Sequence, residues 1–266
     1  MAEIPEWDGE GNVSELLRGE AGKLLKDYAN IEPEKMEAHV KYIAKSGWDV
    51  MRYPCFQKFV FLHLDLSRCP IYQQVIEQTQ SGHLLLDLGC GLGQDIRRLV
   101  QDGAPAENLI GLDVVPEYID LGYQLFMDRS KLASTFLIHD FFQDTPEMDR
   151  LKHRVKIINS GYFMHLWNWE IQLNAAKRMI QLLAPVKDAI ITGVHFGSQS
   201  PGMWAKVPPG LSPMFLHNKE TLSELWIQAG KQTQTTWTIQ IVIEHDKYCR
   251  DIDPDGCRLR WALMRH

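Results

Sequence analysis

A carboxylate and three glycines stand at a spacing that suits the binding of a cationic small molecule. The apolar run at residues 84–88 includes Asp87. Three glycines follow it before an amphipathic helix begins: Gly89, Gly91 and Gly93. Glycines allow a sharp turn and let a ligand lie directly against the backbone. The carboxylate makes this loop attractive to an ammonium group, and S-adenosylmethionine (SAM) carries one.

The glycine loop differs from that of nicotinamide dehydrogenases. Those enzymes use Gly-x-Gly-x-x-Gly and place a diphosphate on the helix N-terminus. Here the third glycine, Gly93, comes one residue early, and Gln94 stands where a dehydrogenase has glycine. Asp87 would also lie close to two phosphate charges, which is unfavourable. The loop therefore favours an ammonium-bearing ligand over a dinucleotide.

Two further apolar runs also end in acidic residues. Residues 109–112 lead to Asp113, and residues 135–139 lead to Asp140, which Phe141 follows. Parallel strands of a doubly wound sheet bring their carboxyl ends to one edge, where ligands bind. We expect Asp87 to face the amine of SAM, Asp113 the ribose hydroxyls, and Asp140 with Phe141 the adenine.

The fourth apolar run opens into a segment rich in aromatic residues. Phe163 and Trp167 flank His165, and a second histidine, His195, follows the fifth run. Aromatic faces suit a methyl group on positive sulfur. The two histidines are candidate bases, although each would equally serve to hold a loop through a backbone hydrogen bond. No histidines or cysteines are spaced as metal ligands, so we expect no bound metal.

These features together resemble the class I SAM-dependent methyltransferases over residues 80–195. The resemblance implies an α/β fold with a doubly wound, mostly parallel, seven-stranded Rossmann-like sheet. It implies SAM as the cofactor and S-adenosylhomocysteine as the product. A non-catalytic protein of the same fold, acting as a partner subunit of another methyltransferase, is the alternative from a different functional class.

Other segments narrow the resemblance to the methyltransferases of fungal meroterpenoid biosynthesis, of the austinol, andrastin and terretonin type. They are Arg52-Tyr53-Pro54-Cys55-Phe56, Gly91-Leu92-Gly93-Gln94-Asp95-Ile96-Arg97, Asn108-Leu109-Ile110-Gly111-Leu112-Asp113 and Leu121-Gly122-Tyr123. That family methylates the carboxyl group of a farnesylated aromatic polyketide acid. By position, its cofactor contacts would be Asp113, Val114, Asp140 and Phe141.

The acceptor group decides which residues must act. A carboxylate, with a pKa near 4, is already a nucleophile at neutral pH and needs no base. His165 would then orient the acid, and Arg52 is another candidate for pairing its charge. A phenol, with a pKa near 10, would instead need His165 or His195 as the base. A phenol O-methyltransferase or a C-methyltransferase acting on another apolar metabolite therefore stays open at this point.

The composition of the chain limits the kinds of binding partner and compartment that we expect. The chain has 266 residues, 45% of them hydrophobic and 23% charged, as in ordinary globular proteins. The net charge of −6 disfavours nucleic acid as a partner. Five cysteines without a Cys-x-x-Cys motif give no disulfide framework. The sequence lacks an apolar leader or a run long enough to span a bilayer, so we expect a cytoplasmic protein.

We expect two parts along the chain. Residues 1–80 would hold a loosely attached arm, residues 1–30, and an aromatic segment, residues 47–62, that serves as a lid or as a homodimer interface. Residues 81–266 would form the SAM-binding domain, with a lid insertion at 196–217. The aromatic segment and the insertion would contact an apolar substrate through Tyr53, Met203 and Trp204, together with Phe163 and Trp167.

Periodicity predicts the elements that position these residues. We expect strands at 84–88, 109–113, 135–139, 155–159, 188–194, 236–244 and 257–264, the last two joined as a hairpin by residues 246–256. We expect helices at 33–46, 70–79, 94–102, 116–128, 167–183 and 219–229, the last ending at Gly230. The basic pair Arg97-Arg98 is interpreted as a solvated helix face.

Overall fold

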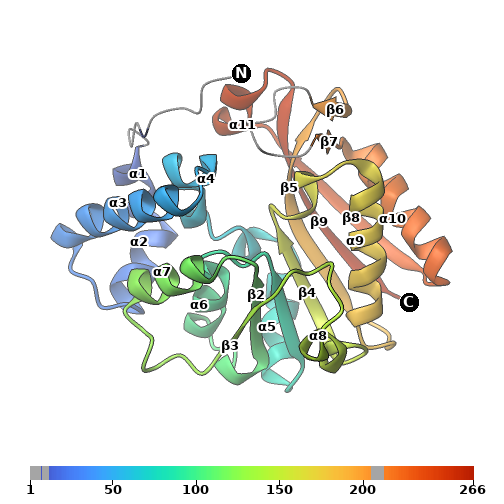
Figure 1. Cartoon of the computed structure of the whole chain (residues 1–266), viewed down its shortest axis with the longest axis horizontal. Coiled ribbons are helices and arrows are strands. Elements are labelled where there is room, and N and C mark those ends of the chain that lie inside the picture. The colour runs from blue at the N-terminus through green and yellow to red at the C-terminus, as the bar shows by residue number, and fades with distance from the viewer. Residues whose placement is uncertain (1–6, 8–11, 205–212) are drawn as a thin grey trace.

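A seven-stranded sheet with helices on both faces organises the computed structural model, which describes residues 7, 12–204 and 213–266 (Figure 1). The strand order is β3-β2-β1-β4-β5-β9-β8. In this sheet β9 runs in the opposite direction to the other six strands and pairs with β5 and β8. The predicted fold class is therefore confirmed. The strands are β1 (Leu84–Leu88), β2 (Leu109–Asp113), β3 (Thr135–Ile138), β4 (Val155–Gly161), β5 (Ile190–Ser198), β8 (Trp237–Glu244) and β9 (Gly256–Arg265).

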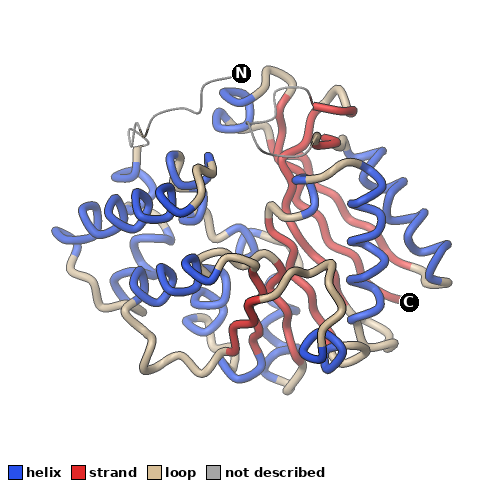
Figure 2. The backbone as a smooth tube through the Cα atoms, viewed as in Figure 1, coloured by secondary structure: helices blue, strands red, loops and turns tan. Residues whose placement is uncertain are grey.

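The central strands are buried on both faces, which explains their continuous apolar runs. Leu85 and Ile157 pack under α5 (Tyr72–Gln80) and α6 (Gln94–Gln101). Their neighbours Leu86 and Ile158 pack under helices on the opposite face, α9 (Trp169–Leu182) and α10 (Lys219–Thr233). Figure 2 shows these helices on either side of the red strands. The alternation fixes the register, and every parallel strand ends at the same edge.

The remaining helices flank this three-layer core. They are α1 (Val13–Leu17), α2 (Glu20–Asp27), α3 (Pro33–Val50), α4 (Pro54–Gln57), α7 (Pro116–Phe126), α8 (Pro146–Leu151) and α11 (Lys247–Ile252). A short hairpin, β6 (Gly202–Trp204) with β7 (Met214–Leu216), lies within the expected insertion. Part of that insertion, residues 205–212, is outside the described residues. No helix of the described residues combines the length and apolarity needed to cross a membrane.

The expectation of a loosely attached arm is wrong for residues 13–28. Helices α1 and α2 bury Val13, Leu24 and Leu25 in a core shared with α3 and α7. In Figure 1 these helices and the segment that follows them, residues 13–64 in blue, form a lobe beside α7, which we call the N-terminal lobe. The polar residues that suggested an arm form the outer faces of two short amphipathic helices. The first residues, 1–6 and 8–11, are outside the described residues.

The interpretation of Arg97 as a solvated residue is also wrong. Its side chain is 0% exposed, and it donates to both carboxylate oxygens of Asp128, from Nε at 2.9 Å and from Nη2 at 3.1 Å. Its Nη1 donates to the carbonyl oxygens of Leu92 and Gly93. Tyr28 of the N-terminal lobe donates to the same carboxylate at 2.7 Å. A buried cation is stable here because its charge is paired and its donors are used.

Several boundaries differ from prediction: α3 continues to Val50, and β5 begins at Ile190 and continues through His195 to Ser198. Two other differences have a local cause. Helix α10 runs past Gly230 to Thr233, and Gln234 adopts the left-handed conformation at its end. Gly230 is needed for packing, because a Cβ there would lie 2.7 Å from the Thr235 carbonyl oxygen. The stretch at 246–256 holds the short helix α11, since the Asp246 side chain accepts from the Cys249 amide and starts a helical turn.

Candidate active site

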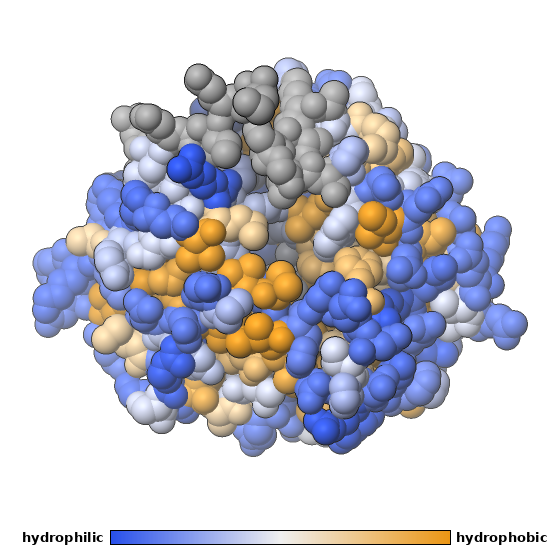
Figure 3. Space-filling view, viewed as in Figure 1, coloured by the Kyte–Doolittle hydropathy of each residue, from blue (hydrophilic) through white to orange (hydrophobic). Residues whose placement is uncertain are grey.

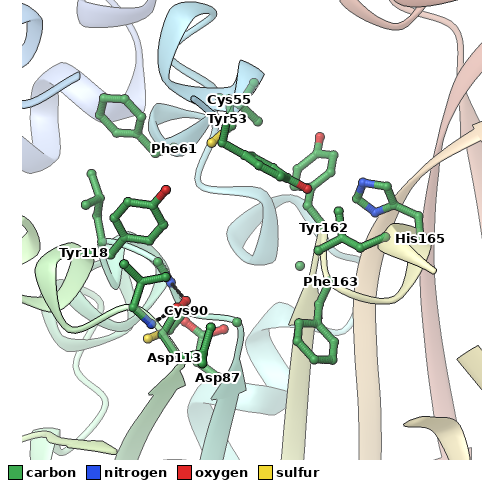
Figure 4. A pocket seen from close by; sticks show the side chains of 18 of the residues that line it. Tyr53, Cys55, Phe61, Asp87, Cys90, Asp113, Tyr118, Tyr162, Phe163 and His165 are labelled. Atoms are coloured by element: carbon green, nitrogen blue, oxygen red, sulfur yellow. Dashed lines mark hydrogen bonds between the residues drawn. The ribbon is translucent and has the colours of Figure 1, made fainter. Parts of the chain in front are cut away.

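A cavity of about 800 Å³ opens at the carboxyl ends of β1, β2 and β4. Its described lining also includes residues of the N-terminal lobe, the β6–β7 hairpin and α11. In Figure 3 hydrophobic residues, in orange, gather around the hollow at the centre of this face. Figure 4 shows carboxylates on the floor, at the strand ends, and aromatic rings on the walls. The cavity therefore combines an acidic half with an apolar half.

The glycine loop connects β1 to α6 in the conformation that its sequence requires. Gly89, Gly91 and Gly93 all have positive φ, between 53° and 69°, where other residues are strained. A Cβ on Gly89 would lie 2.7 Å from the Phe163 ring, whereas a Cβ on Gly91 would meet nothing within 4 Å. Gly89 and Gly91 line the cavity and Gly93 begins the helix, so the loop leaves room for a ligand against its backbone.

Asp113 ends β2 and holds the loop in place. Its two carboxylate oxygens accept from the Gly91 amide at 2.8 Å and from the Val115 amide at 3.0 Å. Burial raises the pKa of Asp113, and these amide hydrogen bonds oppose the rise. The carboxylate lines the cavity. It lies where the sequence predicted a ribose-binding acid, next to Val114, which lines the cavity and is exposed.

Asp87 lies on the floor of the cavity and is 4% exposed. Its Oδ1 accepts from Asn159 Nδ2 at 2.7 Å. Burial raises the pKa of Asp87 to about 7, and the charge of Asp113 adds to the rise. Sequence reasoning missed Asn159, although this polar residue follows the fourth apolar run just as the acids follow the first three. A cation in the cavity would stabilise the ionised form of Asp87.

Asp140 and Phe141 lie beyond β3, at the outer end of the cavity. Asp140 is exposed and accepts from the Phe142 amide at 2.9 Å, while Phe141 is buried against Phe163 with ring centroids 5.6 Å apart. Both line the cavity. The three acids therefore line one cavity in order of rising exposure, from Asp87 through Asp113 to Asp140, and this arrangement fits SAM. Their assignment to amine, ribose and adenine stays a prediction.

Aromatic residues form the wall opposite the acids. Phe163 and Trp167 pack edge to face, with ring centroids 4.7 Å apart, and both line the cavity. Trp204 lines it from the β6–β7 hairpin, with its indole donating to Asp253 at 3.1 Å. Met203 alternates to the other side of the hairpin and is 57% exposed. It does not line the cavity, so the predicted substrate contact of Met203 is not supported.

The three candidate catalytic residues are not brought together. His165 lines the cavity, and burial lowers its pKa to about 4. His195 lies behind it, fully buried, with ring centroids 6.1 Å from His165 and 5.4 Å from Trp261. Arg52 is exposed at the start of the aromatic segment. Neither His195 nor Arg52 lines the cavity, so neither is positioned to touch a ligand there.

Sequence reasoning missed several residues of the apolar half. Tyr118, Tyr162, Tyr248 and Cys55 all line it, and they come from four separate segments. Tyr53 was predicted as a substrate contact, and Figure 4 shows its hydroxyl pointing across the cavity toward Tyr162 and His165. Cys55, Tyr118 and Tyr248 lie on helices that reach the cavity only through tertiary packing, so no local pattern marks them. Tyr162 directly follows β4, so its place at the strand end was a signal that could have found it. Among the described residues that line the cavity there is no lysine or arginine.

Comparison with known protein families matches two parts of the chain. Residues 10–62 match the meroterpenoid methyltransferase N-terminal domain, which includes the aromatic segment and most of the N-terminal lobe. Residues 85–186 match a methyltransferase domain, which includes the glycine loop and β1 to β4. The two matches together reach both halves of the cavity.

Characterised relatives are similar over most of their length. The O-methyltransferase phiE of Fungal sp. (strain ATCC 74256) is 33% identical over 90% of this chain and 81% of its own. The asnovolin E/chermesin D methyltransferase nvfJ of Aspergillus novofumigatus is 32% identical over 92% of this chain and 88% of its own. Such identity over such coverage establishes common descent and a common reaction class.

Solved structures support the fold. The 1,6-didemethyltoxoflavin-N1-methyltransferase of Burkholderia thailandensis, solved with S-adenosylhomocysteine bound, superposes with a TM-score of 0.54 at 18% identity. It covers 85% of this chain and 89% of its own. Together with the acids, the glycine loop and the two domain matches, these similarities place the chain in the fungal meroterpenoid methyltransferase family, as a SAM-dependent enzyme.

Proposed function

We propose that this enzyme transfers the methyl group of SAM to the carboxylate of a prenylated aromatic polyketide acid, forming its methyl ester. The supporting observation is that the one predicted base that lines the cavity, His165, is a poor base. Burial lowers its pKa to about 4. His165 would therefore accept a proton poorly, which favours an acceptor that is already ionised, as a carboxylic acid is at neutral pH.

A phenol acceptor fits these properties less well. Its pKa lies near 10, so transfer of its proton to a histidine of pKa about 4 would be uphill by roughly 8 kcal/mol, at 1.36 kcal/mol per pKa unit. When bound, SAM supplies a methyl group on positively charged sulfur, which would also be the cation nearest to an acceptor carboxylate.

The protein's part would be to position the acceptor and to exclude water. The cavity measures about 800 Å³ as a whole, and its apolar half has an aromatic lining that suits a hydrophobic substrate, with Tyr53, Phe163, Trp167 and Trp204 around it. Correct alignment alone can supply about 7–11 kcal/mol of a barrier. His165 would orient the carboxylate through a hydrogen bond without removing a proton.

The product tests the proposed reaction directly. Incubation with SAM and a farnesylated aromatic acid is expected to add one methyl group, and mild alkaline hydrolysis should remove it as methanol. Mass spectrometry before and after hydrolysis measures both steps. A methyl group that survives hydrolysis would indicate phenol or carbon methylation and overturn the proposal. Tight SAM binding without turnover of any acceptor would favour a non-catalytic partner subunit.

Variants of His165 separate orientation from base catalysis. His165→Gln keeps a hydrogen-bond donor but cannot act as a base, so we expect it to retain most of the wild-type kcat/KM. His165→Ala should lose about tenfold or less, mainly through KM. Loss of a general base would cost both variants about 10²- to 10⁴-fold. Steady-state kinetics measures the difference, and an equal large loss in both would mean that His165 acts as a base.

A further inference from the structure

Three buried carboxylates on the cavity floor come from three separate elements. Asp65 begins η2 (Asp65–Arg68), Asp87 lies in β1, and Asp95 lies in the first turn of α6. They are 7%, 4% and 6% exposed, and all three line the cavity. Buried carboxylates are stable as anions only when a cation or several hydrogen bonds compensate their charge.

Asp65 is compensated and the other two are not. Arg260 Nη2 donates to Asp65 at 2.9 Å, and Arg258 lies 3.9 Å from the same carboxylate oxygen. Among the described residues, Asp87 accepts from the neutral donor Asn159 alone, and Asp95 accepts only from the Leu66 amide, at 3.3 Å. The described cavity lining offers these two acids no lysine or arginine.

The surroundings of Asp95 disfavour the ionised form of its carboxyl group when no ligand is bound. Burial raises its pKa well above the ordinary value, and the charges of Asp87 and Asp65 raise it further. The Leu66 amide and Arg260 oppose this rise, but Arg260 is already paired with Asp65. Because the charge of Asp87 opposes ionisation of Asp95, a cation on the cavity floor would favour the ionised form of both acids.

We propose that Asp95 is a second counter-ion, beside Asp87, for the ammonium group of bound SAM. The carboxylate lies two residues beyond Gly93, in the first turn of α6, and lines the same floor as Asp87. A cation there would allow both acids to ionise and would release a proton from the pair. Because Asp95 also accepts from Leu66, the same side chain joins the ammonium site to η2 and so to the wall of the apolar half.

Calorimetric titration with S-adenosylhomocysteine tests this role without turnover, since that product keeps the ammonium group. We expect Asp95→Asn to weaken binding by about 10- to 100-fold, the range for a lost hydrogen bond between charged groups. Titrations in two buffers of different ionisation enthalpy count the protons released on binding. Wild type should release about one proton more than Asp95→Asn, a difference that a merely structural role would not produce.

Two further variants control the experiment. Asp102→Asn removes a carboxylate from the other end of α6, where Arg98 and Tyr72 pair with it outside the cavity. It should bind the product as wild type does. Asp95→Glu keeps the charge and should bind more tightly than Asp95→Asn. Wild-type affinity and unchanged proton release in folded Asp95→Asn would overturn the proposal, and so would a loss in Asp102→Asn of equal size.

Discussion

Asp87→Asn should abolish tight SAM binding and at the same time make the cofactor-free enzyme more stable above pH 7. Asparagine removes the negative charge that the ammonium group needs but can still accept the hydrogen bond from Asn159. We expect SAM affinity to fall about 100-fold or more, since a buried charge pair loses one partner. The stability gain follows from the raised pKa of Asp87.

The sign of the pH effect is fixed by that pKa. The folded protein holds the Asp87 proton up to about pH 7, whereas the unfolded chain releases it near the ordinary value of 3.8. The folded state binds more protons between these values, so the free energy of unfolding falls as pH rises through this window. At 1.36 kcal/mol per pKa unit the loss reaches about 4 kcal/mol at most by pH 8.

Urea unfolding at pH 5 and pH 8 measures this contribution. Wild type should lose stability between the two pH values, and Asp87→Asn should lose less by a few kcal/mol. Saturating SAM should restore stability to wild type at pH 8 and give the variant almost no protection. Equal pH dependence in the two proteins, or SAM protection of the variant, would contradict a charge-based role for Asp87.

Arg97→Ala is expected to destabilise the fold by about 3–5 kcal/mol, the cost of leaving a buried charge unpaired. The change leaves the buried Asp128 carboxylate with the Tyr28 hydroxyl but without its guanidinium partner. It also removes the hydrogen bonds to the Leu92 and Gly93 carbonyl oxygens of the glycine loop. Arg97→Ala therefore removes the link that runs from Tyr28 of the N-terminal lobe through Asp128 and Arg97 to the glycine loop. SAM affinity should fall as well, because the loop loses two donors.

The adjacent residue provides a matched control. Arg98 pairs with Glu20 and Asp102, and its side chain retains contact with water. Arg98→Ala should cost about 1 kcal/mol or less, as is usual for such ion pairs. Urea denaturation of both variants measures the contrast. If the two substitutions cost the same, the interpretation of Arg97 as a buried tie between the lobe and the loop would be wrong.

Local pattern by itself determined the sheet and the cofactor half of the cavity. Continuous apolar runs must be buried on both faces of a parallel sheet, and residues that follow such runs must meet at one edge. Asp87, Asp113 and Asp140 were therefore predictable, and so were β1 and β2, whose bounds match the prediction. The glycines were predictable for a related reason, because only glycine tolerates their backbone conformation.

Tertiary structure alone decided which charges are buried and which histidine reaches the cavity. Arg97 and Asp128 lie 31 residues apart, Tyr28 and Asp128 lie 100 apart, and Asp65 and Arg260 lie 195 apart. His165 follows β4, whereas His195 lies within β5, and of these two histidines His165 lines the cavity and His195 does not. Periodicity reports whether a side chain faces the core or water. It carries no information on which distant residue will compensate a buried charge, because that depends on how separate elements pack together.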